Sequence, residues 1–268
     1  MRFNQSLRYQ EMNRNLYKQS FTLSNSPDYN CPKCNIGLLR IQKDSFKKYT
    51  TFDLDEIQKH PDFEPEWIEY IFNCVFECNN DRCEGKVLCT GHGSVGFDID
   101  VDDYGQQYQE WDDYYRPLFF HPNLNLITIP EDTPTDIKKI LNQSFELFFT
   151  SPSAAANLVR IAIEGILTDQ GVNLYSKKDG SKKISLHSRI EDHLPDKHQT
   201  IKEHFEAVKW LGNAGSHSGE ELTPNNTMDS YELIEYILSQ VYAPPTNNLD
   251  ELAKEINGSK GPKKRVFL

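Results

Sequence analysis

Three polar side chains recur at every fourth residue near the end of a predicted helix: Lys209, Asn213 and His217. Because residues four apart lie on one face of an α-helix, a helix that continues here brings an amine, an amide and an imidazole together. An imidazole suits general acid–base chemistry, and an amide can orient a substrate. The neighbouring apolar residues Phe205 and Val208 indicate the buried side of that helix. The stretch therefore predicts either a polar site or a contact that ties two helices together.

His217 also has a purely structural interpretation. Gly212 and Gly215 are poor helix-interior residues, so the same stretch is typical of a helix end. A histidine at that position interacts favourably with the negative end of the helix dipole. The residues favour neither interpretation over the other.

Four of the six cysteines form two close pairs. Cys31 and Cys34 are separated by two residues, and Cys78 and Cys83 by four. Each such turn can supply two thiolates to the same tetrahedral zinc ion. The sequence therefore predicts a zinc ribbon with a closed site. We expect the zinc to be structural and to replace a hydrophobic core that so small a subdomain lacks. A docking knuckle for nucleic acid or protein is the alternative.

The two remaining cysteines are not assigned to the zinc site. Cys74 precedes Cys78 by four residues on the same predicted strand, and we expect it to pack beneath the site. Cys89 lies on the strand that follows the second pair and is the alternative ligand if the pairing is wrong. The number of cysteines, without a signal-peptide core or an apolar run long enough to cross a membrane, favours a cytoplasmic metal-binding protein with no membrane contact.

The net charge of −11 is unevenly distributed along the chain. It is +6 over residues 1–50, −13 over 51–116 and −4 over 117–268. The acidic middle argues against a broad nucleic-acid footprint, because phosphate binding needs an electropositive face. Within it, residues 98–113 predict a solvent-exposed acidic loop. The alternatives are a contact surface for a basic partner with Trp111 as an anchor, a calcium loop that lacks its final acid, and mimicry of DNA.

The chain is predicted to have an α+β fold: a small N-terminal zinc ribbon of short antiparallel strands, followed by an all-α antiparallel helical bundle. Proline-rich residues between the two parts predict an extended connection over the surface. The expected divisions are an N-terminal extension (1–27), the ribbon with its acidic loop (28–115), the connector (116–132), the bundle (133–243) and a basic, disordered tail (244–268). Helices are expected over about 133–149, 154–170, 186–193, 196–211 and 228–241.

The central helix of the predicted bundle carries a narrow polar stripe of Asn157, Arg160 and Glu164. An arginine in so apolar a helix needs a partner, because an unpaired buried charge is very costly. The simpler interpretation is an ion pair with Glu164 one turn away that fixes the helix register. In the alternative, Arg160 points toward Asn213 and His217 and supplies a cation there.

Three segments of the chain resemble the prokaryotic domain-of-unknown-function family numbered four-one-four-five, a HEPN-like helical group. They are the lead-in 115–118, the central-helix run 154–164 and the stretch 211–217. Such domains frequently follow a cysteine-pair zinc knuckle, as here, so the resemblance covers roughly residues 28–242. It implies a HEPN-like bundle that forms a homodimer, and an association with phage-defence and mobile-element systems.

The wider HEPN group includes metal-independent ribonucleases, in which two protomers join an arginine, a polar residue and a histidine to cleave RNA. Asn213 and His217 match the last two, but Gly212 stands where the arginine is expected. We therefore expect a non-catalytic interaction module that dimerises and binds a protein or nucleic-acid partner. The alternative is a metal-independent endoribonuclease that uses His217 and Asn213, with Lys209 or Arg160 stabilising the phosphate.

Overall fold

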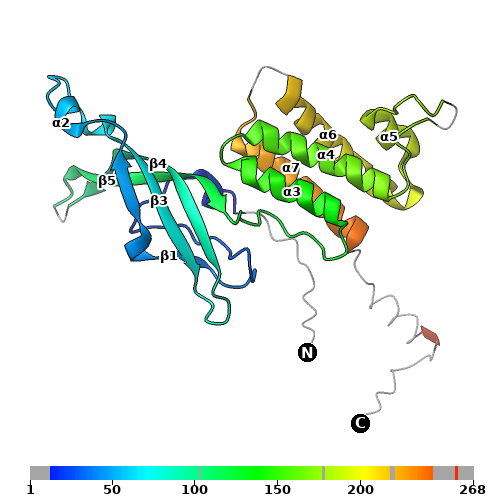
Figure 1. Cartoon of the computed structure of the whole chain (residues 1–268), viewed down its shortest axis with the longest axis horizontal. Coiled ribbons are helices and arrows are strands. Elements are labelled where there is room, and N and C mark those ends of the chain that lie inside the picture. The colour runs from blue at the N-terminus through cyan, green and yellow to red at the C-terminus, as the bar shows by residue number, and fades with distance from the viewer. Residues whose placement is uncertain (1–12, 103, 177–178, 218–220, 244–256, 259–268) are drawn as a thin grey trace, which may run out of the picture.

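The computed structural model describes residues 13–102, 104–176, 179–217, 221–243 and 257–258. A curled sheet and a group of helices lie beside each other along the longest axis of the molecule (Figure 1). The elements up to the end of the sheet are α1 (Asn15–Lys18), β1 (Leu39–Ile41), η1 (Lys43–Ser45), β2 (Lys47–Thr50), α2 (Leu54–Ile57), η2 (Pro65–Trp67), β3 (Glu69–Cys78), β4 (Lys86–Val101) and β5 (Gln107–His121).

The sheet is antiparallel, with the strand order β1-β3-β4-β5 and with β2 also paired to β3. In β3, buried and more exposed side chains alternate, and the buried ones are Tyr70, Phe72, Cys74, Phe76 and Cys78. This period of two is that of a strand with one face on a core. The buried face of the sheet is therefore aromatic.

The expected small N-terminal ribbon of short strands, followed by an all-α bundle, is wrong. The protein is α+β, but its three main strands form a curled sheet over residues 69–121, in the middle of the chain, and helices follow at 135–242. The acidic stretch 98–113 is also no loop, because it lies on β4 and β5 on either side of a tight turn. Its aspartates alternate with apolar residues, and that period of two is the strand signal.

The helices are α3 (Thr135–Phe148), α4 (Pro152–Asp169), α5 (Leu186–His193), η3 (Asp196–Ile201), α6 (Lys202–His217) and α7 (Pro224–Tyr242). These positions agree with the expected helices over 133–149, 154–170 and 186–193, and α5 has the predicted bounds. The helix expected over 196–211 instead starts as the 3-10 helix η3 and continues as α6 to His217, and α7 begins four residues earlier than expected. The central helix α4 packs against α3, α6 and α7. None of the helices in the described ranges is long and apolar enough to cross a membrane.

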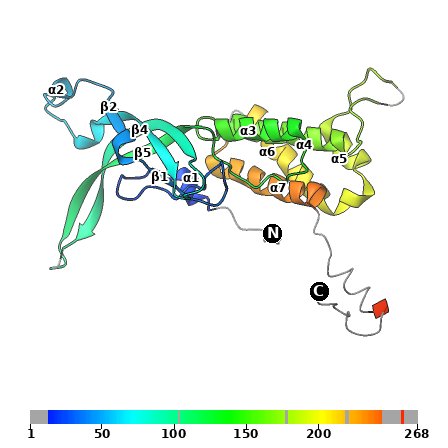
Figure 2. The same ribbon diagram turned by 60° about the horizontal axis from the view of Figure 1, so that its bottom comes forward.

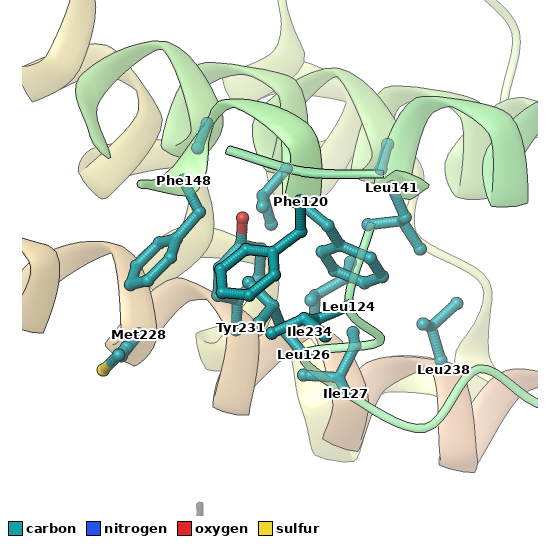
Figure 3. Close-up of a cluster of buried hydrophobic side chains, with 14 of the residues drawn as sticks. Phe120, Leu124, Leu126, Ile127, Leu141, Phe148, Met228, Tyr231, Ile234 and Leu238 are labelled. Carbon is teal, nitrogen blue, oxygen red and sulfur yellow. The ribbon is translucent and has the colours of Figure 1, made fainter. Parts of the chain in front are cut away.

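The connector between sheet and helices does not lie over the surface as expected. β5 takes up its first residues, and Leu124, Leu126 and Ile127 are then buried between α3 and α7 (Figure 3). At the end of the strand, the ring of Phe120 lies 4.9 Å from that of Phe149. The prolines suggested an exposed segment, but apolar side chains lie between them. Burial of those side chains is favourable because it removes apolar surface from water. One hydrophobic core therefore runs through both parts.

The N-terminal extension also joins the two parts, from residue 13 onward. Phe21 exchanges backbone hydrogen bonds of 2.9 and 2.8 Å with Tyr115 on β5. Arg14 forms ion pairs of 2.7 Å with Asp229 and with Glu232 on α7. The basic tail predicted over 244–268 lies outside the described residues, apart from 257–258.

Candidate metal centre and the polar residues of the helices

Two turns that lie far apart in the sequence bring four cysteine thiols together. The Sγ atoms of Cys31, Cys34, Cys78 and Cys83 all lie within 4.8 Å of one another. The closest contacts join the two turns: Cys31 to Cys83 at 3.6 Å and Cys34 to Cys78 at 3.7 Å. A tetrahedral ion with metal–sulfur bonds of about 2.3 Å requires sulfur atoms about 3.8 Å apart. The spacing therefore suits one metal ion and is too long for disulfides.

Both turns are built in the same way. The amide of Cys31 donates to the carbonyl of Gly37 at 2.9 Å, and that of Cys78 donates to Gly85 at 2.8 Å. The residue after the second cysteine of each turn has a positive φ, which is 53° at Asn35 and 50° at Glu84. A left-handed residue there turns the chain back around the thiols.

The glycines that close the turns lie directly against the thiols. A Cβ atom on Gly37 would stand 2.4 Å from the sulfur of Cys78, and one on Gly85 would stand 2.8 Å from that of Cys31. Neither glycine was singled out from the sequence, although each follows its cysteine pair within three residues. The signal was the cysteine pair followed shortly by glycine, which together make a tight turn around a metal.

Backbone amides point at the sulfur atoms. The amide of Gly37 donates to Cys34 at 3.4 Å, and that of Asn80 donates to Cys78 at 3.4 Å. Hydrogen bonds from Gly37 and Ile36 lower the pKa of Cys34 to about 6, because they favour its thiolate. Cys34 is thus prepared as a thiolate, the form that binds metals, whereas burial raises the pKa of Cys78 and that of Cys83.

The metal site is also linked to the connector. The side-chain amide of Asn125 donates to the carbonyl of Pro32 at 3.2 Å and to the side chain of Asn35 at 2.9 Å. The two turns are joined to each other by Leu38 and Asn79, whose backbone and side-chain groups exchange hydrogen bonds of 2.9 and 2.8 Å. The position of the first turn therefore depends on both the second turn and the connector.

The other two cysteines do not belong to this group. Cys74 and Cys89 lie directly opposite each other on β3 and β4, and both are fully buried. Burial raises the pKa of Cys89, which keeps its thiol protonated. Within the described residues, the four-cysteine group is the one cluster of histidine, cysteine and carboxylate side chains that could hold a metal.

The polar residues singled out in the helices are placed as follows. Lys209 is only 3% exposed; its amine lies 3.2 Å from Nδ1 of His187 and 4.0 Å from the centre of the Trp210 ring. Asn213 is half-buried on α6. His217 is the last residue of α6, but its side chain lies outside the described part of the structure. The helix thus continues through all three positions, as one interpretation of the spacing required, but Lys209 is buried.

Arg160 makes the ion pair that its spacing predicted. Its Nη1 donates to Glu164 at 2.7 Å and its Nε donates to Asn157 at 3.2 Å. Its aliphatic stem covers Gly212, where a Cβ would stand 2.4 Å from the Cβ of Arg160. One turn later, a Cβ on Gly215 would stand 2.8 Å from the carbonyl oxygen of Ser153. Both glycines therefore allow α6 to approach α4 closely.

Two family models match the chain. Residues 19–120 match a domain of unknown function, DUF8608, and residues 142–259 match another, DUF4145. The first match includes all four cysteines of the metal centre, and the second is the family that the helical segments resemble. No curated protein and no solved structure matches the chain.

We predict that Gly37→Ala weakens metal binding, because the added methyl group displaces the sulfur of Cys78 or opens the turn. Competition with a coloured chelator should show a loss of affinity of at least about tenfold, as expected when the surroundings of ligands are disturbed. Gly180→Ala is the matched control, since nothing lies within 4 Å of the added Cβ. Equal affinity in both variants would contradict the described geometry.

Gly212→Ala should destabilise the helices, because the methyl group meets the rigid base of the Arg160 side chain rather than its flexible end. Urea unfolding should show a loss of about 1–3 kcal/mol, although alanine is the better helix former by about 1 kcal/mol. Gly212→Arg should be worse still. A stable Gly212→Arg protein would show that α4 and α6 are not in close contact there.

Proposed function

We propose that this protein is a non-catalytic interaction module in which one structural zinc ion fastens the start of the chain to the sheet. The observation that carries the proposal is the set of four thiols at tetrahedral spacing. A zinc ion with four protein thiolates has no open position for water or substrate, so it stabilises structure and catalyses nothing. Following the resemblance of its helices, we further propose a cytoplasmic homodimer joined through the helices, which acts in prokaryotic phage defence or mobile-element biology.

The choice of zinc follows from the donor set. Four thiolates in a tetrahedron suit zinc or iron, whereas magnesium and calcium prefer oxygen ligands. Three of the four cysteines are buried, and backbone amides donate to Cys34 and Cys78, which suits a permanently bound ion. Zinc has no redox chemistry, so it is the simpler choice for a site without a second function.

The second candidate is the metal-independent endoribonuclease. In its favour, Asn213 and His217 belong to one helix, and Arg160 covers the neighbouring Gly212. Against it, the guanidinium of Arg160 already binds Glu164 and Asn157, and Lys209 is buried against His187. A cation that stabilises a transition state must be aimed at the reacting phosphate. Both candidate cations are instead directed at neighbouring side chains, which supports the module.

Removal of the metal should unfold the cysteine turns before the helices. We expect a strong chelator to abolish the near-ultraviolet circular dichroism of the aromatic sheet while most of the helical far-ultraviolet signal remains, because α4 packs against α3, α6 and α7 within the helical part. Zinc, but not magnesium, should restore the signal. A spectrum that does not change after proven metal loss would contradict a structural role.

Incubation of the purified full chain with total RNA in the presence of a magnesium chelator tests the activity itself. The module predicts no cleavage above background, and no difference between the wild type and His217→Ala. Cleavage by the wild type that is lost in His217→Ala and Asn213→Ala would overturn the proposal. The zinc content of each variant should be measured at the same time, so that unfolding is not mistaken for inactivity.

A further inference from the structure

The ends of β4 and β5 project beyond the rest of the sheet. β3 pairs with β4 only as far as Ser94, whereas β4 and β5 continue to pair up to Val101 and Gln107. We call residues 97–112 the arm. Figure 2 shows it extending away from both the remaining strands and the helices. Every described residue of the arm is exposed. A ribbon of two strands with no layer on either face is marginally stable in water.

One face of the arm is apolar. Phe97, Ile99 and Val101 alternate along β4, and their exposed fractions are 38%, 63% and 53%. Trp111 lies opposite Phe97 on β5, with the two ring centres 5.1 Å apart and 41% of the tryptophan exposed. Contiguous exposed apolar side chains of this kind, with an aromatic pair, are typical of protein-binding surfaces.

The opposite face of the arm is acidic. Asp98 lies directly across from Glu110, and Asp100 from Tyr108. Like charges in directly opposed positions destabilise a strand pair, so this arrangement has a cost in the isolated protein. Over residues 97–112 there are six acidic residues and no lysine, arginine or histidine. The cost is removed if cations from another molecule pair with the carboxylates.

The carboxylates of the arm are not arranged for a metal ion. Asp102 accepts the amides of Tyr104 and Gln106, at 2.9 and 2.8 Å, and so holds the turn of the hairpin. Asp98 accepts the hydroxyl of Tyr114 at 2.7 Å. In the parts of the chain that the structure describes, no group of carboxylates lies close enough to hold a cation. The matching positive charges are therefore those of a polypeptide.

We infer that the arm is a docking surface for a basic polypeptide segment, with Phe97 and Trp111 as apolar anchors and Asp98 and Glu110 as partners of lysine or arginine. The inference rests on the proposed function and names the surface and the class of partner. Nucleic acids and anionic membranes are repelled by the arm, and so is the arm of a second copy. A basic strand that alternates with apolar residues satisfies both faces and the free backbone edge of β5.

The test uses a fluorescent peptide of alternating lysine and valine, and a control peptide of alternating glutamate and valine, titrated with the zinc-loaded full chain. We expect the lysine peptide to bind, with an affinity that falls as salt rises, and the glutamate peptide not to bind. Two double variants should each weaken binding by at least about tenfold. One is Asp98→Asn with Glu110→Gln, and the other is Phe97→Ser with Trp111→Ser.

The matched control is Glu56→Gln with Glu66→Gln, which removes the same charge from exposed residues outside the arm. Binding that this control weakens as much as the arm variants do, or that the arm variants leave unchanged, would overturn the inference. Equal binding of a single-stranded RNA probe to the arm would also overturn it. RNA cleavage would reject the proposed function but leave peptide binding to be judged on its own, so the two failures are distinguishable.

Discussion

In our proposal, the fold depends on one distance constraint, the spacing that a metal ion imposes on four sulfur atoms. The turn at Cys31–Cys34 precedes β1, and the turn at Cys78–Cys83 joins β3 to β4. A shared ion converts these into one rigid corner, because its binding free energy becomes folding free energy. Asn125 then hydrogen-bonds the first turn to the connector, whose apolar side chains fill the space between α3 and α7. The metal centre is thereby coupled to the helices through the connector.

The glycine at 212 has a packing explanation that also bears on function. A residue with a side chain at that position would collide with the base of Arg160. The guanidinium of Arg160 binds Asn157 and Glu164 on its own helix, where its charge is satisfied. The position at which the resemblance to HEPN ribonucleases leads one to expect an arginine thus serves helix packing here. In our proposal this is why the helices bind rather than cleave.

Local signals predicted the parts of this structure that depend on a few neighbouring residues. The cysteine pairs and the intrahelical pair of Arg160 with Glu164 follow from fixed spacing, and the helix positions follow from periodicity and capping residues. The sheet was misjudged because acidic residues at every second position along β4 suggested a loop. The charges there indicated a loop, whereas the alternation of charged and apolar residues indicated a strand. Backbone pairing with β5 makes the segment a strand.

The errors that remain share a physical cause, which is packing between distant segments. Leu124, Leu126 and Ile127 look like part of a proline-rich linker until α3 and α7 provide a groove for them. Likewise, the spacing groups Lys209 with Asn213 and His217, but Lys209 is buried against His187 on α5. A local sequence pattern cannot predict these contacts, because each one joins residues that are far apart in the sequence and meet only in the folded chain.

The central claim is that zinc is held by four thiolates in a closed structural site. X-ray absorption at the zinc edge of the purified protein tests it most directly. Our account predicts four sulfur neighbours at about 2.3 Å, with no oxygen or nitrogen, and the same spectrum after Cys74→Ser or Cys89→Ser. Fewer than four sulfur atoms, a water ligand, or a first shell that changes when Cys89 is replaced would contradict it.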